Sequence, residues 1–207
     1  ASNLVEKNHI LYNYIKARSL FFESIAEKNH LKAVGILKQA LTLEEDAPYV
    51  LNRIGLRYAD ANLTDSAIHY YQKALALAPT WSFPYNNLGI QYWENKMYDK
   101  AIENCLKSIS YAPNNGSPYN VLGHVYEETG KYELAKTNYL KSISLDPKSS
   151  YPYNGLGNVY MDLEDYEKAK TYYEKAIEID SADSSPHIGL GNVYSNSAYR
   201  FKANEKA

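Results

Sequence analysis

The sequence contains little that would support covalent chemistry or a membrane location. Cys105 is its single cysteine, which excludes an intramolecular disulfide and a thiolate zinc site. It has no apolar run of about 18 residues or more, so no membrane-spanning helix is expected. The N-terminus lacks the apolar stretch and small-residue cleavage site of a signal peptide. The compartment stays open on this basis, with the cytoplasm favoured.

An excess of charge of either sign is also missing. The chain has 22 Lys and Arg against 24 Asp and Glu, for a net charge of −2. Nucleic-acid and membrane-surface proteins usually show a basic excess or a basic stripe, so we predict neither kind of partner. The five histidines show no metal-ligand spacing, and no phosphate-binding loop or nucleophile motif can be assembled. We therefore predict no cofactor, no metal and no catalytic residue.

Aromatic residues are unevenly represented, because 22 tyrosines stand beside only 4 Phe and 2 Trp. Such a bias indicates that one template has been copied several times. The sequence repeats itself at an offset of 34 residues, and Pro-Tyr-Asn recurs at residues 84–86, 118–120 and 152–154. The same interval separates Gly55, Gly89, Gly123, Gly157 and Gly191, and also Tyr58, Tyr92, Tyr126, Tyr160 and Tyr194.

Each copy is predicted to form two helices, as residues 82–115 illustrate. Ser82 is placed to cap the first helix, and Pro84 suits its first turn. Tyr85, Leu88, Gly89 and Tyr92 then form one apolar face at helical spacing. After a turn over residues 94–98, a second helix is expected from near Asp99, whose charge favours a helix N-terminus. Its predicted buried stripe is Ala101, Ile102, Cys105, Ser108 and Ile109, and Pro113 ends it.

These recurring residues resemble the tetratricopeptide repeat family. The third copy matches the family pattern at Tyr119, Leu122, Gly123, Tyr126, Ala135, Tyr139 and Pro147. The resemblance covers four units, at residues 48–81, 82–115, 116–149 and 150–183. Ser108, Ser142 and Ser181 depart from the pattern. The resemblance implies an all-α fold, a right-handed α-solenoid superhelix of stacked antiparallel helix pairs with the first helices lining a concave groove.

The two ends are less regular than the four central units. Residues 1–47 are interpreted as a long leading helix, over residues 3–28, plus a degenerate repeat in which Phe21 stands where glycine is expected. Residues 184–207 are interpreted as the first helix of a fifth, incomplete or capping unit. Because stacked repeats need a polar cap over the last face, either this segment is a single capping helix or the chain is a piece of a longer array.

A second face of each first helix, about 140° from the apolar face, is the predicted partner-binding surface. It forms columns with the repeat interval. The first is Asn52, Asn86, Asn120 and Asn154; the second is Leu56, Ile90, His124, Asn158 and Asn192. The third is aromatic, with Tyr49, Phe83 and Tyr151, and Trp93 lies on the same face. The fourth is acidic, with Asp60, Glu94, Glu128 and Asp162.

Two of these columns allow two explanations each. An asparagine amide offers a donor and an acceptor, so the row can bind the backbone of an extended peptide, or each Asn can bond to a neighbouring repeat. The acids lie near helix C-termini, where the helix dipole disfavours them. They either pair with lysines of the adjacent repeat or select a partner with basic side chains.

The sequence therefore predicts a non-catalytic scaffold or adaptor that binds an extended peptide or a helix of a partner protein in its groove. Two alternatives remain. The chain is the recognition arm of a larger multidomain enzyme, or it self-assembles through uncapped ends.

Overall fold

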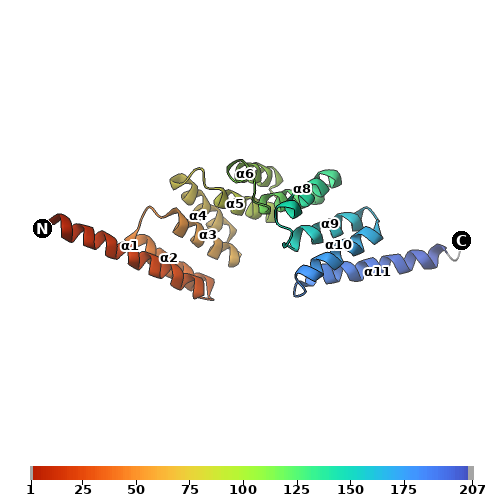
Figure 1. Ribbon diagram of the computed structural model, residues 1–207, viewed down its shortest axis with the longest axis horizontal. Coiled ribbons are helices and arrows are strands. Elements are labelled where there is room, and N and C mark those ends of the chain that lie inside the picture. Colours follow the sequence, from red (N-terminus) through yellow and green to blue (C-terminus); the bar gives the residue numbers. More distant parts are fainter. Residues whose placement is uncertain (1, 205–207) are drawn as a thin grey trace. The chain divides into compact units, whose positions relative to one another are not determined.

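The structure is a computed structural model that describes residues 2–204; Ala1 and residues 205–207, which the sequence assigned to the terminal units, lie outside the described part. The described residues form eleven α-helices and no strand (Figure 1). The chain divides into two compact units, Ala1–Asn95 and Lys96–Ala207. The boundary between them falls inside the 82–115 repeat, at the turn between its two helices.

The first unit holds five helices. They are α1 (Ser2–Ala26), α2 (His30–Leu43), α3 (Pro48–Asp60), α4 (Thr64–Leu77) and α5 (Ser82–Glu94). Helix α1 packs on α2 and α3 packs on α4, while α2 contacts α3 and α4 contacts α5. The core around the first pair consists of Ala17, Val34, Leu37, Ala40, Ala47, Val50 and Ile54. This core therefore joins helices of two successive pairs.

Arg57 attaches the end of α1 to α3. Its Nη2 donates to the backbone oxygens of Ser24 at 2.7 Å and Ile25 at 3.1 Å, and the side chain is almost fully buried. The last carbonyls of a helix have no partner within the helix and sit at its negative end. A guanidinium satisfies both needs, so Arg57 acts as a C-cap supplied from another helix.

The second unit holds the remaining six helices. They are α6 (Tyr98–Tyr111), α7 (Ser117–Glu128), α8 (Tyr132–Leu145), α9 (Tyr151–Asp162), α10 (Tyr166–Ile179) and α11 (Ser184–Asn204). Helix α7 pairs with α8 and α9 with α10, and each pair contacts the next helix in the chain. Tyr139, Leu156 and Val159 lie in one core cluster, and Tyr173 and Val193 in the next. Helix α11 continues without a break to Asn204.

Three tyrosines of the second helices pack directly against glycines. A Cβ added to Gly55 would come within 2.5 Å of Tyr71 Cε1, and Gly123 and Gly157 face Tyr139 and Tyr173 in the same way. The rings of Tyr139 and Tyr173 also contact Gly155 and Gly189 of the following repeat. The glycines are thus needed because a ring occupies the space of their missing side chains, and two rings each fill space in two repeats.

The turn between the two helices of each repeat contains one residue in the left-handed region. The φ angles are +57° at Asn62, +58° at Lys96, +71° at Gly130 and +60° at Glu164. The four positions are spaced by the repeat interval, and only one of them is glycine. A non-glycine residue is strained in this conformation, so Lys96 and Glu164 store a small amount of strain.

One detail of the predicted helix start at Ser82 is wrong. Helix α5 begins at Ser82 itself and its N-cap is Trp81, which makes no side-chain capping bond. Ser82 is buried in the first turn. The second helix begins at Tyr98, and Asp99 lies in its first turn.

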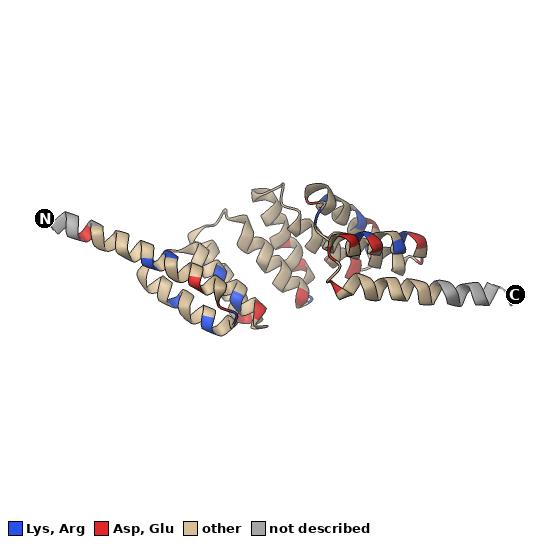
Figure 2. Ribbon diagram, turned by 60° about the horizontal axis from the view of Figure 1, so that its bottom comes forward, with Lys and Arg blue, Asp and Glu red and all other residues tan. Residues whose placement is uncertain are grey.

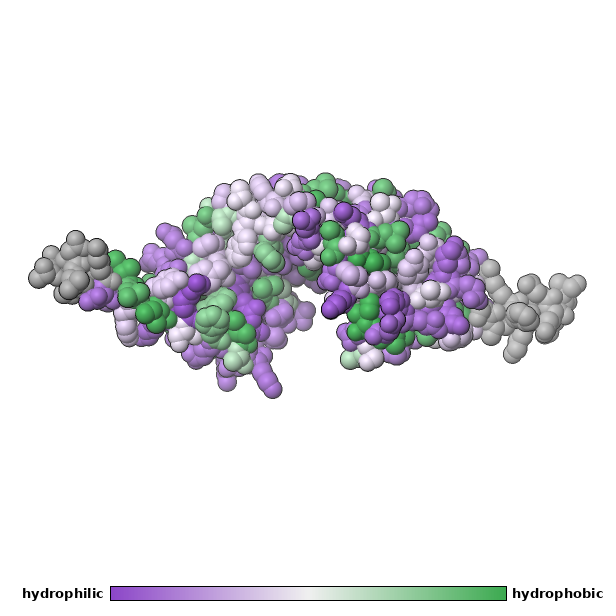
Figure 3. All heavy atoms as spheres, in the orientation of Figure 1, coloured by the Kyte–Doolittle hydropathy of each residue, from purple (hydrophilic) through white to green (hydrophobic). Residues whose placement is uncertain are grey.

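Helix α1 exposes a large apolar surface in the first unit. The exposed fractions are 62% for Ile10, 57% for Leu11, 59% for Ile15 and 66% for Phe22. Figure 3 shows green, apolar side chains along this helix. Exposed apolar patches of this kind mark interaction surfaces more often than single exposed residues do.

Candidate functional site

The column of four asparagines divides in two according to hydrogen bonding. Asn52 Oδ1 accepts a 3.1 Å bond from Nδ2 of Asn87 in the next repeat. The Oδ1 atoms of Asn86, Asn120 and Asn154 are buried and have no hydrogen-bond partner. Asn52 and Asn86 are buried overall, while Asn120 and Asn154 are half-buried. Bonding between repeats thus accounts for Asn52, and the other three amide oxygens have no partner among the described protein atoms.

His124 and Asn158, in the second column, each meet a buried tyrosine of their own repeat. The Tyr139 hydroxyl lies 2.8 Å from His124 Nδ1, and the Tyr173 hydroxyl donates to Asn158 Oδ1 at 2.8 Å. These bonds connect α7 to α8 and α9 to α10. Burial raises the pKa of both tyrosine hydroxyls, and the neighbouring Glu127 raises it further. Both hydroxyls are therefore protonated and able to donate.

Glu127 contacts two residues of this region, and the sequence columns did not reveal it. Its carboxylate accepts a hydrogen bond from the Tyr139 hydroxyl and lies 3.8 Å from His124 Nδ1. Its side chain is only 14% exposed. The residues at the same position in other repeats include Ala59, Trp93 and Met161, so no periodic signal marks the position.

The acidic column is held mainly by neutral hydrogen-bond donors. Glu128 accepts a 2.8 Å bond from Tyr98, which lies 30 residues earlier at the start of α6. Asp162 bonds to Tyr132 at the same separation, and desolvation, then the charge of Glu127, raises the pKa of Asp162. The sequence offered adjacent-repeat lysines as ordinary partners; the structure shows adjacent-repeat tyrosines for these two acids.

Asp60 and Glu94 complete this column in the first unit. Asp60 lies 3.7 Å from Arg57 and 3.5 Å from His30 Nδ1. Glu94 accepts a 2.8 Å bond from Gln91 on its own helix. Although Glu94 is exposed as a whole residue, desolvation of its carboxylate raises its pKa, and the bond from Gln91 opposes that rise.

The aromatic residues of the predicted surface differ in their exposure to solvent. Phe83 and Tyr151 are 58% and 65% exposed, whereas Trp93 is half-buried. Tyr49 packs edge-on against Phe21 with ring centroids 5.2 Å apart, and its hydroxyl donates to Glu44 at 2.7 Å. Burial and Glu44 raise the pKa of Tyr49 to about 12. Tyr49 therefore belongs to the packing of the first helices, and Phe83 and Tyr151 present open rings.

Two hollows bring predicted residues together. One of about 430 Å³ in the first unit is lined by Leu56, Ala59, Asp60, Asn62, Thr64, Tyr71, Asn87, Ile90, Gln91, Glu94 and Asn95. The other, of about 400 Å³, lies in the second unit between the starts of α7 and α9. Asn120 and Tyr151 are among its lining residues.

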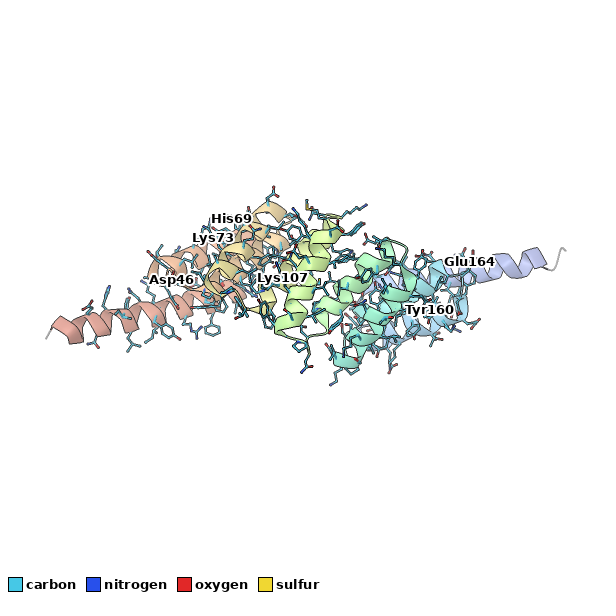
Figure 4. The ribbon with its side chains drawn as sticks, turned by 90° about the horizontal axis from the view of Figure 1, so that it is seen from above. Asp46, His69, Lys73, Lys107, Tyr160 and Glu164 are labelled. Atoms are coloured by element: carbon cyan, nitrogen blue, oxygen red, sulfur yellow. The ribbon has the colours of Figure 1, made fainter. Side chains whose placement is uncertain are left out.

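The recurring lysines of the second helices lie on a solvated face. Lys73, Lys107, Lys141 and Lys175 are all exposed, and Figure 4 labels the first two on α4 and α6. Lys107 and Lys175 bond to Glu103 and Glu178, each at 2.7 Å. Figure 2 shows charges of both signs along the helices of each unit. Surface pairs of this kind contribute little to stability.

The part of the chain that the structure describes holds neither a metal site nor a membrane span. No group of three or more His, Cys, Asp or Glu side chains there could hold a metal ion. Within the same residues, no helix is long and apolar enough to cross a membrane.

Comparisons with solved structures identify the same fold in other proteins. Cut9, from a structure titled "Crystal structure of APC/C hetero-tetramer Cut9-Hcn1", is 19% identical with a TM-score of 0.82; the match covers 88% of this chain and 37% of that one. The TPR protein TTC0263 of Thermus thermophilus is 15% identical, with a TM-score of 0.74 and coverage of 86% and 98%. MamA of Desulfovibrio magneticus RS-1 is 22% identical, with a TM-score of 0.68 and coverage of 83% and 98%. At these identities the likeness concerns the fold, and the chain spans well under half the length of Cut9.

Family models give the identity of the repeats directly. No curated protein matches the sequence. Models described as tetratricopeptide repeat match residues 48–80, 84–115 and 117–149, and a further one matches residues 150–183. With eleven helices in its described part and these repeats over most of its length, the chain belongs to the tetratricopeptide repeat family and has its all-α fold of stacked antiparallel helix pairs.

Proposed function

We propose that this chain is a non-catalytic interaction scaffold that binds an extended peptide or a helix of a partner protein along its first helices. The observation that carries the proposal is the set of three unsatisfied amide oxygens, at Asn86, Asn120 and Asn154. They occupy the same position in three successive repeats, on first helices that also carry the exposed rings of Phe83 and Tyr151.

The physical argument starts from the cost of an unsatisfied polar atom. A buried acceptor without a donor costs about 1–3 kcal/mol, and such atoms are rare enough in folded proteins that each needs an explanation. The same arrangement in three repeats indicates a common cause. Rotation of each amide would present its oxygen to a peptide N–H and its Nδ2 to a peptide carbonyl. Each repeat would then offer the same pair of bonds to the backbone of a bound segment.

Exposed aromatic rings supply the apolar part of such a surface. Phe83 and Tyr151 belong to different units, and each stands at the start of its helix. Aromatic side chains are enriched at the centres of protein interfaces because they bury much area with little loss of conformational entropy. Their exposure supports a protein partner, in line with the hetero-tetramer in which Cut9 was solved.

A random-peptide display selection tests the proposal. The wild-type chain is compared with the triple variant Asn86→Ala/Asn120→Ala/Asn154→Ala. The matched control is Asn104→Ala/Asn138→Ala, because these asparagines lie on second helices and bond to backbone oxygens of their own helices at 2.8 Å. We expect the wild type and the control to enrich the same peptides and the triple variant to lose them. Enrichment of the same peptides by all three proteins would refute the assignment.

Self-assembly is a second candidate, favoured by the exposed apolar face of α1 in the first unit. Burial of that face between copies would remove apolar area from water, at about 25 cal/mol per Å². Light scattering over a concentration series tests this candidate. A growing particle mass that Ile15→Glu suppresses supports it, and a monomer at every concentration excludes it.

A further inference from the structure

We propose that the hollow between α3 and α5 in the first unit is a subsite for an arginine side chain of the bound segment. The inference rests on the proposed function and specifies the chemistry of the partner at one place along the groove. The hollow measures about 430 Å³ and is formed by the groove-facing positions of two successive first helices, together with residues of α4.

The lining of the hollow is acidic and holds no basic residue. Asp60 and Glu94 both line it, one from α3 and one from α5, together with Gln91 and Asn87. Leu56, Ala59 and Ile90 supply apolar surface, which suits the aliphatic stem of a long cationic side chain. Arg57 and His30 reach Asp60 at 3.7 and 3.5 Å, but neither lines the hollow.

Tyr71 is the independent observation that identifies the hollow as a ligand site. Its side chain is 1% exposed and lines the hollow. The equivalent tyrosines of two later repeats bond to His124 and Asn158, but the corresponding position in this repeat is Leu56, which offers no acceptor. Among the described residues the Tyr71 hydroxyl has no hydrogen-bond partner. Tyr71, which is 1% exposed, thus brings a hydroxyl without a protein hydrogen-bond partner to the lining of an acidic hollow.

The electrostatics of the site favour a cation. Burial raises the pKa of the Tyr71 hydroxyl, and the charges of Asp60 and Glu94 raise it further. Desolvation also raises the pKa of Glu94. Two carboxylates and a protonated tyrosine therefore share a region whose lining lacks a positive charge, and a bound cation would stabilise all three groups.

The number and placement of acceptors favour arginine over lysine. A guanidinium has five N–H donors in a plane and can bond to two carboxylates on opposite sides. A lysine ammonium is a compact and strongly hydrated point charge, which is suited to one carboxylate. Here the two carboxylates come from different helices and the Tyr71 hydroxyl adds a third acceptor from α4, which a planar, multiply donating group matches.

A direct test uses NMR titration of the full chain with the pentapeptide Ac-Gly-Gly-Arg-Gly-Gly-amide. The control probe replaces Arg with citrulline, which has nearly the same shape and no charge. We expect the Arg peptide to shift the Tyr71 ring resonances and the Glu94 amide resonance. The citrulline peptide should bind about tenfold more weakly than the Arg peptide, or weaker still. Equal binding of both probes, or shifts that avoid Tyr71 and Glu94, would overturn the subsite.

Variants separate binding from folding. Glu94→Gln removes the charge and Tyr71→Phe removes only the hydroxyl; Glu23→Gln on the exposed surface of α1 is the control of equal charge change. We expect Glu94→Gln to weaken binding of the Arg peptide by about tenfold and Tyr71→Phe by about fivefold. Neither variant should have a lower melting temperature than the wild type. Glu23→Gln should bind the Arg peptide as the wild type does. A Glu94→Gln protein that binds normally contradicts the proposal.

The peptide selection described above distinguishes failure of the subsite from failure of the proposed function. If the wild type enriches no peptide, the scaffold function itself is refuted. If it enriches peptides without a recurrent arginine, or if Glu94→Gln enriches the same arginine-containing peptides, only the subsite is refuted. Recurrent arginine that is lost in Glu94→Gln and kept in Glu23→Gln supports both.

Discussion

The hydroxyl of Tyr173 on α10 donates a 2.8 Å hydrogen bond to Oδ1 of Asn158 on α9, and the equivalent hydroxyl of Tyr71 on α4 bonds to no described residue. Each ring is almost fully buried against a glycine of its own repeat, and the Tyr173 ring also contacts Gly189 of the following repeat. The Tyr173 hydroxyl therefore stabilises the folded state through a hydrogen bond, whereas the Tyr71 hydroxyl makes no such bond within the protein.

The first prediction compares the loss of these two hydroxyls. Tyr173→Phe removes a bond and leaves Asn158 Oδ1 without its donor, so we expect a loss of about 1 kcal/mol in the free energy of unfolding. Tyr71→Phe removes no bond and should leave stability unchanged or slightly higher. Urea unfolding followed by circular dichroism measures both. Equal destabilisation by the two substitutions would contradict the difference in bonding.

A second prediction concerns the close approach of ring and glycine. Gly157→Ala forces its new methyl group into the Tyr173 ring, and we expect a loss of about 1–3 kcal/mol through overpacking. Gly35→Ala is the matched control, since Gly35 lies inside α2 with nothing within 4 Å of the added Cβ. The control should gain about 0.5–1 kcal/mol from helix propensity alone. Thermal unfolding would show opposite shifts, and a Gly157→Ala protein as stable as the wild type would refute the close packing.

The turn of the 82–115 repeat gives a third prediction. Lys96 has a φ of +58°, a conformation that costs an L-residue about 1 kcal/mol. Lys96→Gly removes this strain but gives the unfolded chain more freedom, so we expect a net gain of up to about 0.5 kcal/mol. Lys96→Val, with a β-branched side chain, should be the less stable of the two variants by more than this amount. The reverse order in a chemical denaturation experiment would show that the turn is not strained.

The fourth prediction concerns how the contribution of Glu94 to stability changes with pH. Burial raises the folded-state pKa of Glu94, so the folded chain binds this proton more tightly than the unfolded chain. Its contribution to stability is therefore unfavourable at neutral pH and improves as the pH falls through the raised pKa. We expect Glu94→Gln to melt at a higher temperature than the wild type at pH 7. The difference should shrink in acid, where the wild-type carboxyl is neutral as well.

Glu103 provides the control of opposite sign for this measurement. The hydrogen bond and charge of Lys107 lower the pKa of Glu103. Its pairing thus favours the folded state at neutral pH, and the benefit disappears as the pH falls through the lowered pKa. Glu103→Gln should melt slightly lower than the wild type at pH 7 and equally in acid. Shifts of the same sign for the two variants at pH 7 would contradict one of the two assignments, and unchanged melting of both would contradict both.

Periodic features of the chain could be predicted from the sequence, and features made by single residues could not. The helix pairs follow the interval at which Gly55, Gly123 and Gly157 recur. These predictions succeed because the same local pattern is repeated and each copy supports the next. The partner-binding role of the groove columns stays a prediction.

The missed features depend on side chains meeting across space. The bond from Tyr98 to Glu128 joins residues 30 positions apart, and the sequence columns on the first helices did not include the tyrosines that begin the second helices. Glu127 was missed because its column holds Ala59, Trp93 and Met161, which share no property. The expected cap at Ser82 was wrong because the helix includes that residue and so starts one position earlier than a capping role allows. A shift of one residue determines which residue is the N-cap, and helix boundaries cannot be predicted from a sequence pattern to that precision.

The shared rings have a consequence for treating the repeats as interchangeable modules. Tyr139 and Tyr173 each reach into the following copy, and that copy has Gly155 or Gly189 at the point of contact. In the repeat after Cys105, which is smaller than tyrosine, the residue equivalent to Gly155 is Val121. In the repeat after Tyr71, the equivalent residue is Asn87. A copy that follows Tyr139 or Tyr173 must therefore carry glycine at this position, so the order of the copies is constrained. Moving the Val121 copy behind either of these rings would place a side chain where a hydrogen atom is required.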